Sequence, residues 1–211
     1  NVKMTIKFAL ATASWGQDEI DAMQSVIASG MYSMGEKVKT FENSFANHTG
    51  SKFCVMVNSG SSANLLMVAA LFYTKNLMLK LKRGDEIIVP AVSWSTTYFP
   101  LYQYGLKIKF VDIDMHTLNY DLHSLAEAVS DKTRAIMVVN LLGNPNDFEC
   151  IEKIIDGRNI FYIEDNCESL GATYKGKQAG TFGVMGTFST FFSHHISTME
   201  GGLIVTNNEE I

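Results

Sequence analysis

The fold is decided by residues 53–73, which read FCVMV, NSGSS and ANLLMVAALFY. The apolar run at 53–57 predicts a short buried strand, and the longer apolar run at 63–73 predicts a helix. A Gly/Ser-rich turn joins the two. A strand followed by a helix is the unit from which α/β proteins are built. This segment therefore predicts an α/β fold.

Strand and helix patterns alternate outward from this segment. Two amphipathic helices are expected before it, at 18–29 and 36–48. After it, strands are expected at 86–89, 108–111, 135–139 and 160–163, with helices at 98–104, 122–129 and 148–155. Such alternation predicts a mostly parallel sheet sandwiched by helices on both faces.

No helix pattern follows residue 163, where the chain becomes rich in Gly. Strands are expected at 172–174, 186–189 and 203–206, and we place them at the edges of the sheet. The last residues, 207–211, resemble the cap and first turn of a further helix. We therefore expect residues 1–211 to be one large domain of a longer protein whose C-terminal small domain is missing here, although a complete small protein remains an alternative.

The composition is that of a globular chain, with 46% apolar and 18% charged residues and a net charge of −5. The basic residues do not cluster, which argues against nucleic acid or a membrane surface as partner. Residues 1–16 lack the pattern of a signal peptide, so a cytoplasmic location is expected. The odd set of cysteines predicts reduced thiols and no metal site: Cys54, Cys150 and Cys167.

Two strand ends carry residues suited to an anionic, aromatic ligand. Gly60, Ser61 and Ser62 lie between a strand and a helix, where free N–H groups and hydroxyls suit a phosphate. The alternative is simple helix capping. Asp165 follows the strand at 160–163 and could pair with a protonated ring nitrogen, or could merely cap a loop.

Two further segments add candidate residues. Trp94 lies in a polar loop after the strand at 86–89, where it could stack on a flat ring or serve as a core or interface residue. Ser189 ends a strand and could donate to a phosphate. His194 and His195 are adjacent, so in a strand they would face opposite ways and only one could enter a given site. Taken alone, such a pair is usually a surface or structural feature.

In this order and at these intervals, the segments resemble the DegT/DnrJ/EryC1/StrS family of nucleotide-sugar aminotransferases over essentially the whole chain. The stretch 186–202, GTFSTFFSHHISTMEGG, resembles the family's cofactor-lysine segment, with His194 at the lysine position. The resemblance implies the aspartate aminotransferase-type fold (fold type I), pyridoxal 5'-phosphate or pyridoxamine 5'-phosphate as cofactor, and a homodimer with a shared active site.

The resemblance also assigns roles to individual residues. Trp94 should stack on the cofactor ring, Asp165 should pair with the ring nitrogen, and Glu168 should lie near the ring hydroxyl or the reacting group. His194 should be the catalytic residue. The cofactor phosphate should be held by Gly60, Ser61, Ser62 and Ser189.

A histidine cannot form a Schiff base with the cofactor aldehyde, so ordinary transamination is not expected. Within the family, this exchange implies a 3-dehydratase that removes the C3 hydroxyl of a nucleotide-linked 4-keto-6-deoxyhexose, with L-glutamate as amine donor and His194 as base. GDP-4-keto-6-deoxy-D-mannose, of the colitose pathway, is the expected substrate. Alternatives are the CDP-4-keto-6-deoxyglucose reaction, an inactive aminotransferase homologue, a metal-binding module built on His194 and His195, and a partner-binding half-domain.

Overall fold

The computed structural model describes residues 14–211, so most of the segment examined for a signal peptide lies outside the described residues. Its helices are α1 (Gln17–Ser29), α2 (Glu36–Thr49), α3 (Gly60–Tyr73), α4 (Ser95–Gln103), α5 (Leu122–Ala128) and α6 (Phe148–Ile155), with a 3₁₀ turn η1 at Leu141–Gly143. Its main strands are β1 (Phe53–Val57), β2 (Glu86–Pro90), β3 (Lys107–Val111), β4 (Thr133–Val139), β5 (Phe161–Asp165), β8 (Met185–Ser189) and β9 (Gly202–Thr206). A separate hairpin is formed by β6 (Thr173–Tyr174) and β7 (Lys177–Gln178).

The main sheet has seven strands in the order β1-β9-β8-β5-β4-β2-β3. Strands β3, β2, β4, β5 and β8 pair in parallel, which confirms the expected mostly parallel sheet. Strand β9 is antiparallel to both β8 and β1, so β1 runs in the same direction as the parallel strands. Six carboxyl ends therefore meet at one edge of the sheet, together with the amino end of β9.

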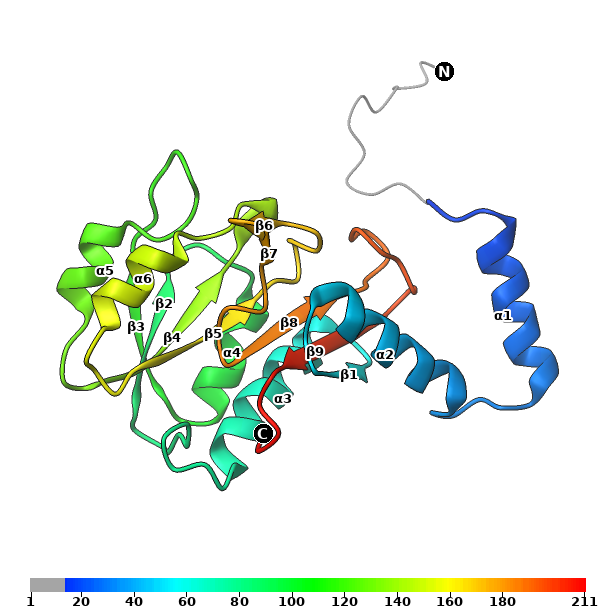
Figure 1. The fold of residues 1–211 in the computed structure, drawn as a ribbon, viewed down its shortest axis with the longest axis horizontal. Helices are drawn as coiled ribbons and strands as arrows, with labels where there is room; N and C mark the ends of the chain where they lie inside the picture. The colour runs from blue at the N-terminus through cyan, green and yellow to red at the C-terminus, as the bar shows by residue number, and fades with distance from the viewer. Residues whose placement is uncertain (1–13) are drawn as a thin grey trace, which may run out of the picture.

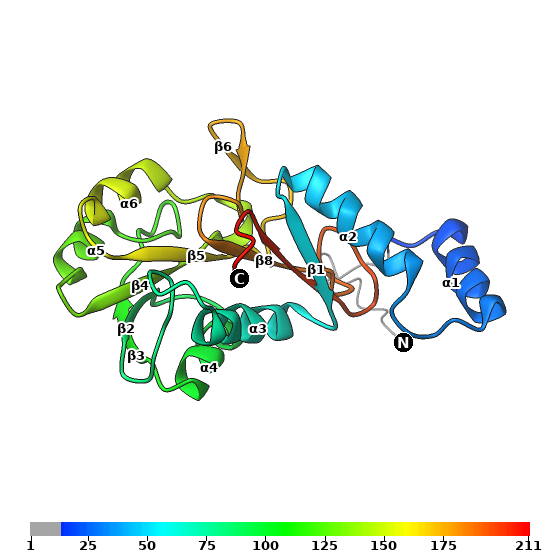
Figure 2. The ribbon, with the colours of Figure 1, turned by 60° about the horizontal axis from the view of Figure 1, so that its bottom comes forward.

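Helices cover both faces of the sheet (Figures 1 and 2). On one face, Met67 of α3 and Leu101 of α4 pack on alternate strand residues such as Ile87. On the other face, Leu125 of α5 and Phe148 of α6 pack on the intervening residues such as Ile88. Helix α2 extends this second layer over β8 and β9, where Phe45 meets Phe188 edge to face. The central strands β2 and β4 are almost wholly buried and carry nearly continuous apolar runs. The edge strands β1 and β3 are partly exposed.

The expected place of the late strands was wrong. Strands β8 and β9 lie inside the sheet, between β5 and β1, and the sheet edges are β1 and β3. The expected strand at 172–174 belongs to the separate β6–β7 hairpin. Local sequence patterns indicate that a strand forms, but strand order depends on contacts between distant segments, which these patterns do not encode.

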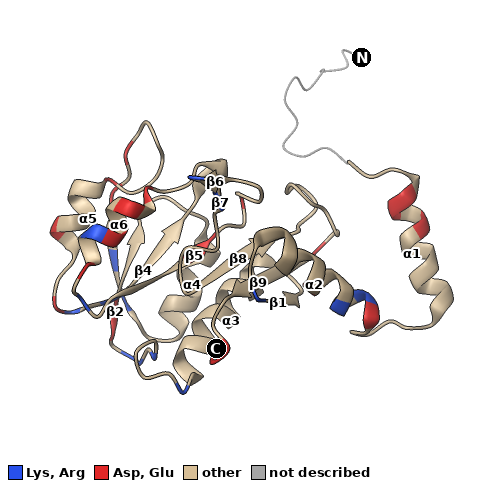
Figure 3. Cartoon of the chain, in the orientation of Figure 1, with Lys and Arg blue, Asp and Glu red and all other residues tan. Residues whose placement is uncertain are grey.

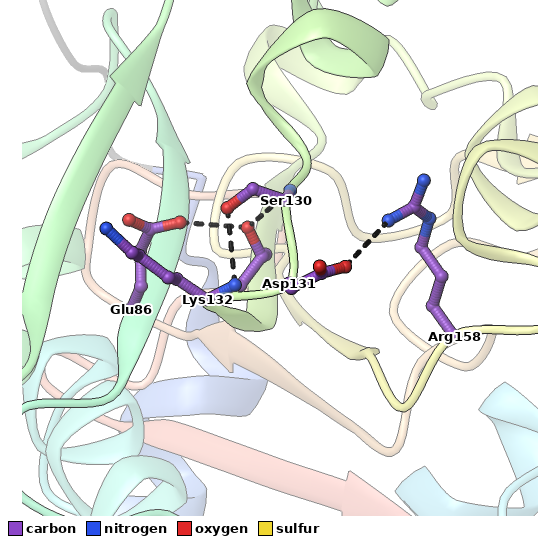
Figure 4. Close-up of polar contacts among 6 residues, drawn as sticks. Glu86, Ser130, Asp131, Lys132 and Arg158 are labelled. Carbon is purple, nitrogen blue, oxygen red and sulfur yellow. Dashed lines mark hydrogen bonds and ion pairs between the residues drawn. The ribbon is translucent and has the colours of Figure 1, made fainter.

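At the amino ends of the strands, polar contacts join β2 to the turn before β4 (Figure 4). The Thr133 hydroxyl donates to Glu86 at 2.9 Å and accepts from the Ser130 N–H at 3.1 Å. These contacts hold the two strand starts together next to the register shift after Glu86. The Arg158–Asp131 ion pair beside them is exposed and 3.8 Å long, so it contributes little.

Helix α1 lies apart from the rest of the structure and has no buried residue (Figure 1). Lysine and arginine residues are spread over separate helices and loops (Figure 3). Among residues 14–211, none of the helices combines the length and apolarity needed to cross a lipid bilayer.

Candidate active site

A cavity of about 560 Å³ opens at the edge where the carboxyl ends of the strands meet. Ligands of open α/β sheets bind at this edge, because loops and helix N-termini converge there. The lining residues come from the segments that follow β1, β2, β4, β5 and β8, and they are Ser59, Gly60, Ser61, Asn64, Ser93, Trp94, Thr96, Val139, Asn140, Leu141, Asp165, Cys167, Glu168, Ser189, Phe191, Ser193, His194 and Glu200.

The N-terminus of α3 forms one wall of the cavity. Helix α3 begins at Gly60, three residues earlier than expected, because the Ser59 hydroxyl caps it by accepting from the Ser62 N–H at 3.0 Å. The early start brings Gly60 and Ser61 into the first helical turn, where free N–H groups attract anions. Ser62 is not among the lining residues, and its hydroxyl lies 3.1 Å from that of Ser59.

Gly60 is pressed against the end of β8. A Cβ atom at this position would lie 2.8 Å from both Cys167 Sγ and Ser189 Cβ. Ser189 is buried, and its hydroxyl accepts from the Phe191 N–H at 3.2 Å. The absence of a side chain thus lets the helix N-terminus and the Ser189 hydroxyl share one wall of the cavity.

Trp94 and Asp165 line the cavity in contrasting environments. Trp94 immediately precedes α4, and its side chain is 71% exposed, so the indole ring is available to a ligand. Asp165 ends β5 and is buried. Its carboxylate accepts hydrogen bonds from the Asn64 amide at 2.8 Å and the Thr97 hydroxyl at 2.7 Å.

Two buried polar atoms on the cavity wall have no hydrogen-bond partner among the described residues. They are Oε2 of Glu168 and Nδ1 of His194. Buried polar atoms in native proteins are nearly always satisfied, so an unpaired pair beside one cavity indicates a polar ligand.

His194 lies in the loop between β8 and β9. The loop consists of turns and bends, so the strand geometry that would turn the two histidines to opposite sides does not apply here. The hydroxyls of Thr190 and Thr198 lie 2.7 Å apart and close the base of the loop. His194 faces the cavity, whereas His195 is exposed and does not line it.

The charged side chains that line the cavity in the described part of the chain are acidic. Three of its lining residues carry carboxyl groups, namely Asp165, Glu168 and Glu200, and within residues 14–211 its lining contains no Lys or Arg. Burial raises the pKa of the Cys167 thiol well above its usual range, so this side chain stays neutral. In the same described range, no group of three or more His, Cys, Asp or Glu side chains is arranged to hold a metal ion.

The structure brings seven of the eight residues proposed from the sequence to one cavity, and Ser62 is the exception. Asn64, Asn140 and Thr97 were not predicted from the sequence. Asn64 had a usable signal, because it is a polar residue in an otherwise apolar helix. Asn140 also had one, since it directly follows a strand of the parallel sheet. Thr97 had none that distinguishes it from its hydroxyl-bearing neighbours.

Residues 14–211 match the model of the DegT/DnrJ/EryC1/StrS aminotransferase family. The chain belongs to this family. It is 62% identical over 209 residues to GDP-4-keto-6-deoxy-D-mannose 3-dehydratase of Yersinia pseudotuberculosis, covering 99% of this chain and 53% of that protein. It is 65% identical over 206 residues to the protein of the same name from Escherichia coli, covering 98% of this chain and 53% of the relative. The chain thus spans about half the length of the curated relatives that it matches.

A solved structure of GDP-4-keto-6-deoxymannose-3-dehydratase with a trapped PLP-glutamate geminal diamine superimposes with a TM-score of 0.94. The two sequences are 64% identical, and the match covers 97% of this chain and 52% of that one. The expected architecture, the fold type I of pyridoxal phosphate-dependent aminotransferases, is confirmed by this family's structures.

Proposed function

We propose that residues 1–211 are the cofactor-binding large domain of a pyridoxal phosphate/pyridoxamine phosphate-dependent 3-dehydratase. Its substrate is GDP-4-keto-6-deoxy-D-mannose, its amine donor is L-glutamate, and it acts in the cytoplasm. The observation that carries the proposal is that His194, which the resemblance aligns with the family's lysine, lines the cavity. The names of the relatives support the substrate.

The cavity fits the cofactor. The first turn of α3, with Gly60 and Ser61, provides an anion site of the kind that holds a phosphate. The exposed indole of Trp94 offers a flat stacking surface, and buried Asp165 offers an anion for a protonated ring nitrogen. The unpaired atoms of Glu168 and His194 leave one acceptor and one imidazole nitrogen for the ring hydroxyl and the reacting carbon.

When bound, the cofactor supplies an amine for the sugar ketone and an electron sink that allows the C3 hydroxyl to leave. His194 holds and moves a proton, because an imidazole exchanges protons near neutral pH. Its Nδ1 is buried against the cavity wall without a competing partner among the described residues. The same imidazole can return the proton to the departing hydroxyl. His194 cannot form a covalent link to the cofactor, so it does not compete with the sugar for the cofactor's reacting carbon.

We further propose that the active unit is a homodimer with a shared active site. A phosphate and a nucleoside diphosphate bring several negative charges to a cavity whose lining has three carboxyl groups and, in the described residues, no Lys or Arg. Burying such ligands without cations is costly. Cationic side chains must therefore enter from another part of the complete protein or from a second copy.

The mass of the sugar product tests the function. The complete protein is incubated with pyridoxal phosphate, L-glutamate and GDP-4-keto-6-deoxy-D-mannose, and the product is analysed by mass spectrometry. A 3-deoxy keto-sugar with released ammonia supports the proposal. A 4-amino sugar that keeps its C3 hydroxyl contradicts it. If only CDP-4-keto-6-deoxyglucose reacts, the protein is a dehydratase but the assignment of GDP as the nucleotide is wrong. No turnover with either substrate favours an inactive homologue.

A further inference from the structure

A buried polar network surrounds Asp165 on the side away from solvent. Oδ2 of Asp165 accepts from Asn64 Nδ2 at 2.8 Å and from Thr97 Oγ1 at 2.7 Å. Oδ1 accepts from the Cys167 backbone N–H, at 3.2 Å. Thr97 is fully buried and Asn64 is 1% exposed, so water does not replace these donors.

The surroundings of Asn64 fix the orientation of its amide. Nδ2 faces two acceptors, Asp165 Oδ2 and, at 3.4 Å, the Thr96 carbonyl. Oδ1 accepts from the Thr187 hydroxyl at 2.7 Å. A flipped amide would place its oxygen against both of these acceptors, so the donor side must face Asp165.

The two oxygens of the Asp165 carboxylate differ in their hydrogen-bond donors. Each carboxylate oxygen can accept about two hydrogen bonds. Oδ2 already has two side-chain donors, whereas Oδ1 has one backbone donor among residues 14–211 and keeps room for one more. The two donors on Oδ2 hold the rotation of the carboxylate.

We propose that Asn64 and Thr97 are positioning residues that clamp Oδ2 of Asp165, so that Oδ1 is presented to the ring nitrogen of the cofactor. This inference rests on the proposed function, which assigns Asp165 to that nitrogen. Neither residue touches the reacting atoms in this role. Their contribution is to keep the ring nitrogen protonated and the ring in place.

The test uses the complete protein loaded with pyridoxamine phosphate that is isotopically labelled at the ring nitrogen. Nitrogen NMR distinguishes a protonated from an unprotonated ring, and a titration gives the cofactor dissociation constant. The variants are Thr97→Val, which removes the hydroxyl at nearly constant volume, and Thr97→Ser, which keeps it. Thr133→Val is the matched control, because it removes another buried hydroxyl at the opposite edge of the sheet.

Thr97→Val should move the ring-nitrogen signal toward the unprotonated form and weaken cofactor binding roughly tenfold, since a hydrogen bond to a charged group is lost. Thr97→Ser should restore both readouts, and Thr133→Val should leave both unchanged. If Thr97→Val does not fold, Asn64→Leu removes the other donor and should give the same spectral change.

The Asp165→Asn variant separates the clamp by Asn64 and Thr97 from the assignment of Asp165 to the ring nitrogen. A wild-type signal and affinity in Thr97→Val or Asn64→Leu, together with a changed signal in Asp165→Asn, would overturn the clamp alone. An unprotonated ring in the wild-type protein, or an unchanged signal in Asp165→Asn, would overturn the assignment of Asp165 and the clamp with it.

Discussion

Gly60 lies where helix α3 comes closest to the end of β8. In Gly60→Ala, the new methyl group would lie 2.8 Å from Cys167 Sγ and Ser189 Cβ, so the helix N-terminus must shift. We expect the free energy of unfolding to fall by about 1–3 kcal/mol and cofactor binding to weaken. Denaturant unfolding and a cofactor titration measure both effects.

Gly35→Ala is the control for this prediction, because the nearest atom to its Cβ, Met31 Cγ, lies at 3.7 Å. In that variant the free energy of unfolding should fall by less than about 1 kcal/mol, because Ala is less favourable than Gly at the N-cap of α2. Equal effects in the two variants would contradict the steric explanation for Gly60.

Glu164 precedes Asp165 on β5, but its hydrogen bonds to the surrounding fold give its side chain a structural role. Its carboxylate accepts from the N–H groups of Gly180, Phe182 and Gly183 at 2.6–2.7 Å and from Asn140 at 3.1 Å. Glu164→Gln would turn an amide NH₂ toward one of these donors in either rotamer. We expect a loss of about 1–3 kcal/mol in the free energy of unfolding, because buried donors lose their acceptor.

The pH dependence gives a second test of the same side chain. Burial raises the pKa of Glu164 above its ordinary value of 4.5, although the backbone donors oppose this shift. The folded state therefore holds the proton more tightly than the unfolded state. The stability advantage of the wild type over Glu164→Gln should be greatest below pH 4.5 and decline as pH rises through the folded pKa. An advantage that grows with pH, measured by denaturant unfolding, would refute this.

The β8–β9 loop is the element that carries His194. The hydroxyls of Thr190 and Thr198 are in contact within this loop. The Thr198 N–H also donates to the Thr190 carbonyl at 2.9 Å, and the Phe192 N–H donates to the Met199 carbonyl at 3.0 Å. Thr198→Val removes the contact between the hydroxyls and the bonds from the Thr198 hydroxyl to the carbonyls of Thr190 and Glu200, and it keeps the backbone bonds. Amide exchange at 191–199 should become roughly fivefold faster, since a typical hydrogen bond contributes about 1 kcal/mol.

Mass-spectrometric hydrogen exchange measures this change. Thr173→Val, at an exposed position of β6, is the matched control and should leave the loop unchanged. An unaltered exchange rate in Thr198→Val would mean that the threonine contact does not hold the loop.

Element type was largely predictable from the sequence, and element placement was not. The strand at 53–57 was predicted with its bounds, because a short apolar run between polar turns has one good structural explanation. The prediction that it is buried was wrong, since β1 is an edge strand and is partly exposed. Its place at the sheet edge beside β9 depends on a pairing between residues about 150 positions apart, as Phe53 with Thr206. The start of α3 was missed by three residues, since the Ser59 cap acts through one side-chain bond.

The residues of the candidate site also differ in whether the sequence could predict them. Residues at strand ends, such as Asp165 and Trp94, could be proposed because topology brings strand ends together. Asn64 and Thr97 act through Asp165 and are defined by distances of 2.7–2.8 Å, which no local pattern reveals.

At the scale of the molecule, apolar side chains remain exposed between the body and α1. Met31, Tyr32 and Met34 are 59%, 76% and 67% exposed. Neighbouring exposed apolar residues of this size mark interaction surfaces. If they belong to the proposed homodimer interface, the complete protein should sediment as a dimer, and Tyr32→Ser should weaken its self-association roughly tenfold. A monomer at all concentrations would contradict the dimer.

The central claim is that His194 moves the proton in the dehydration step. The measurement that tests it most directly is the dehydration rate of His194→Ala, compared with that of His195→Ala, in complete protein loaded with pyridoxamine phosphate. We predict at least a roughly 100-fold loss of rate for His194→Ala with the cofactor still bound, and near-normal turnover for His195→Ala. Near-normal turnover by His194→Ala would contradict the account.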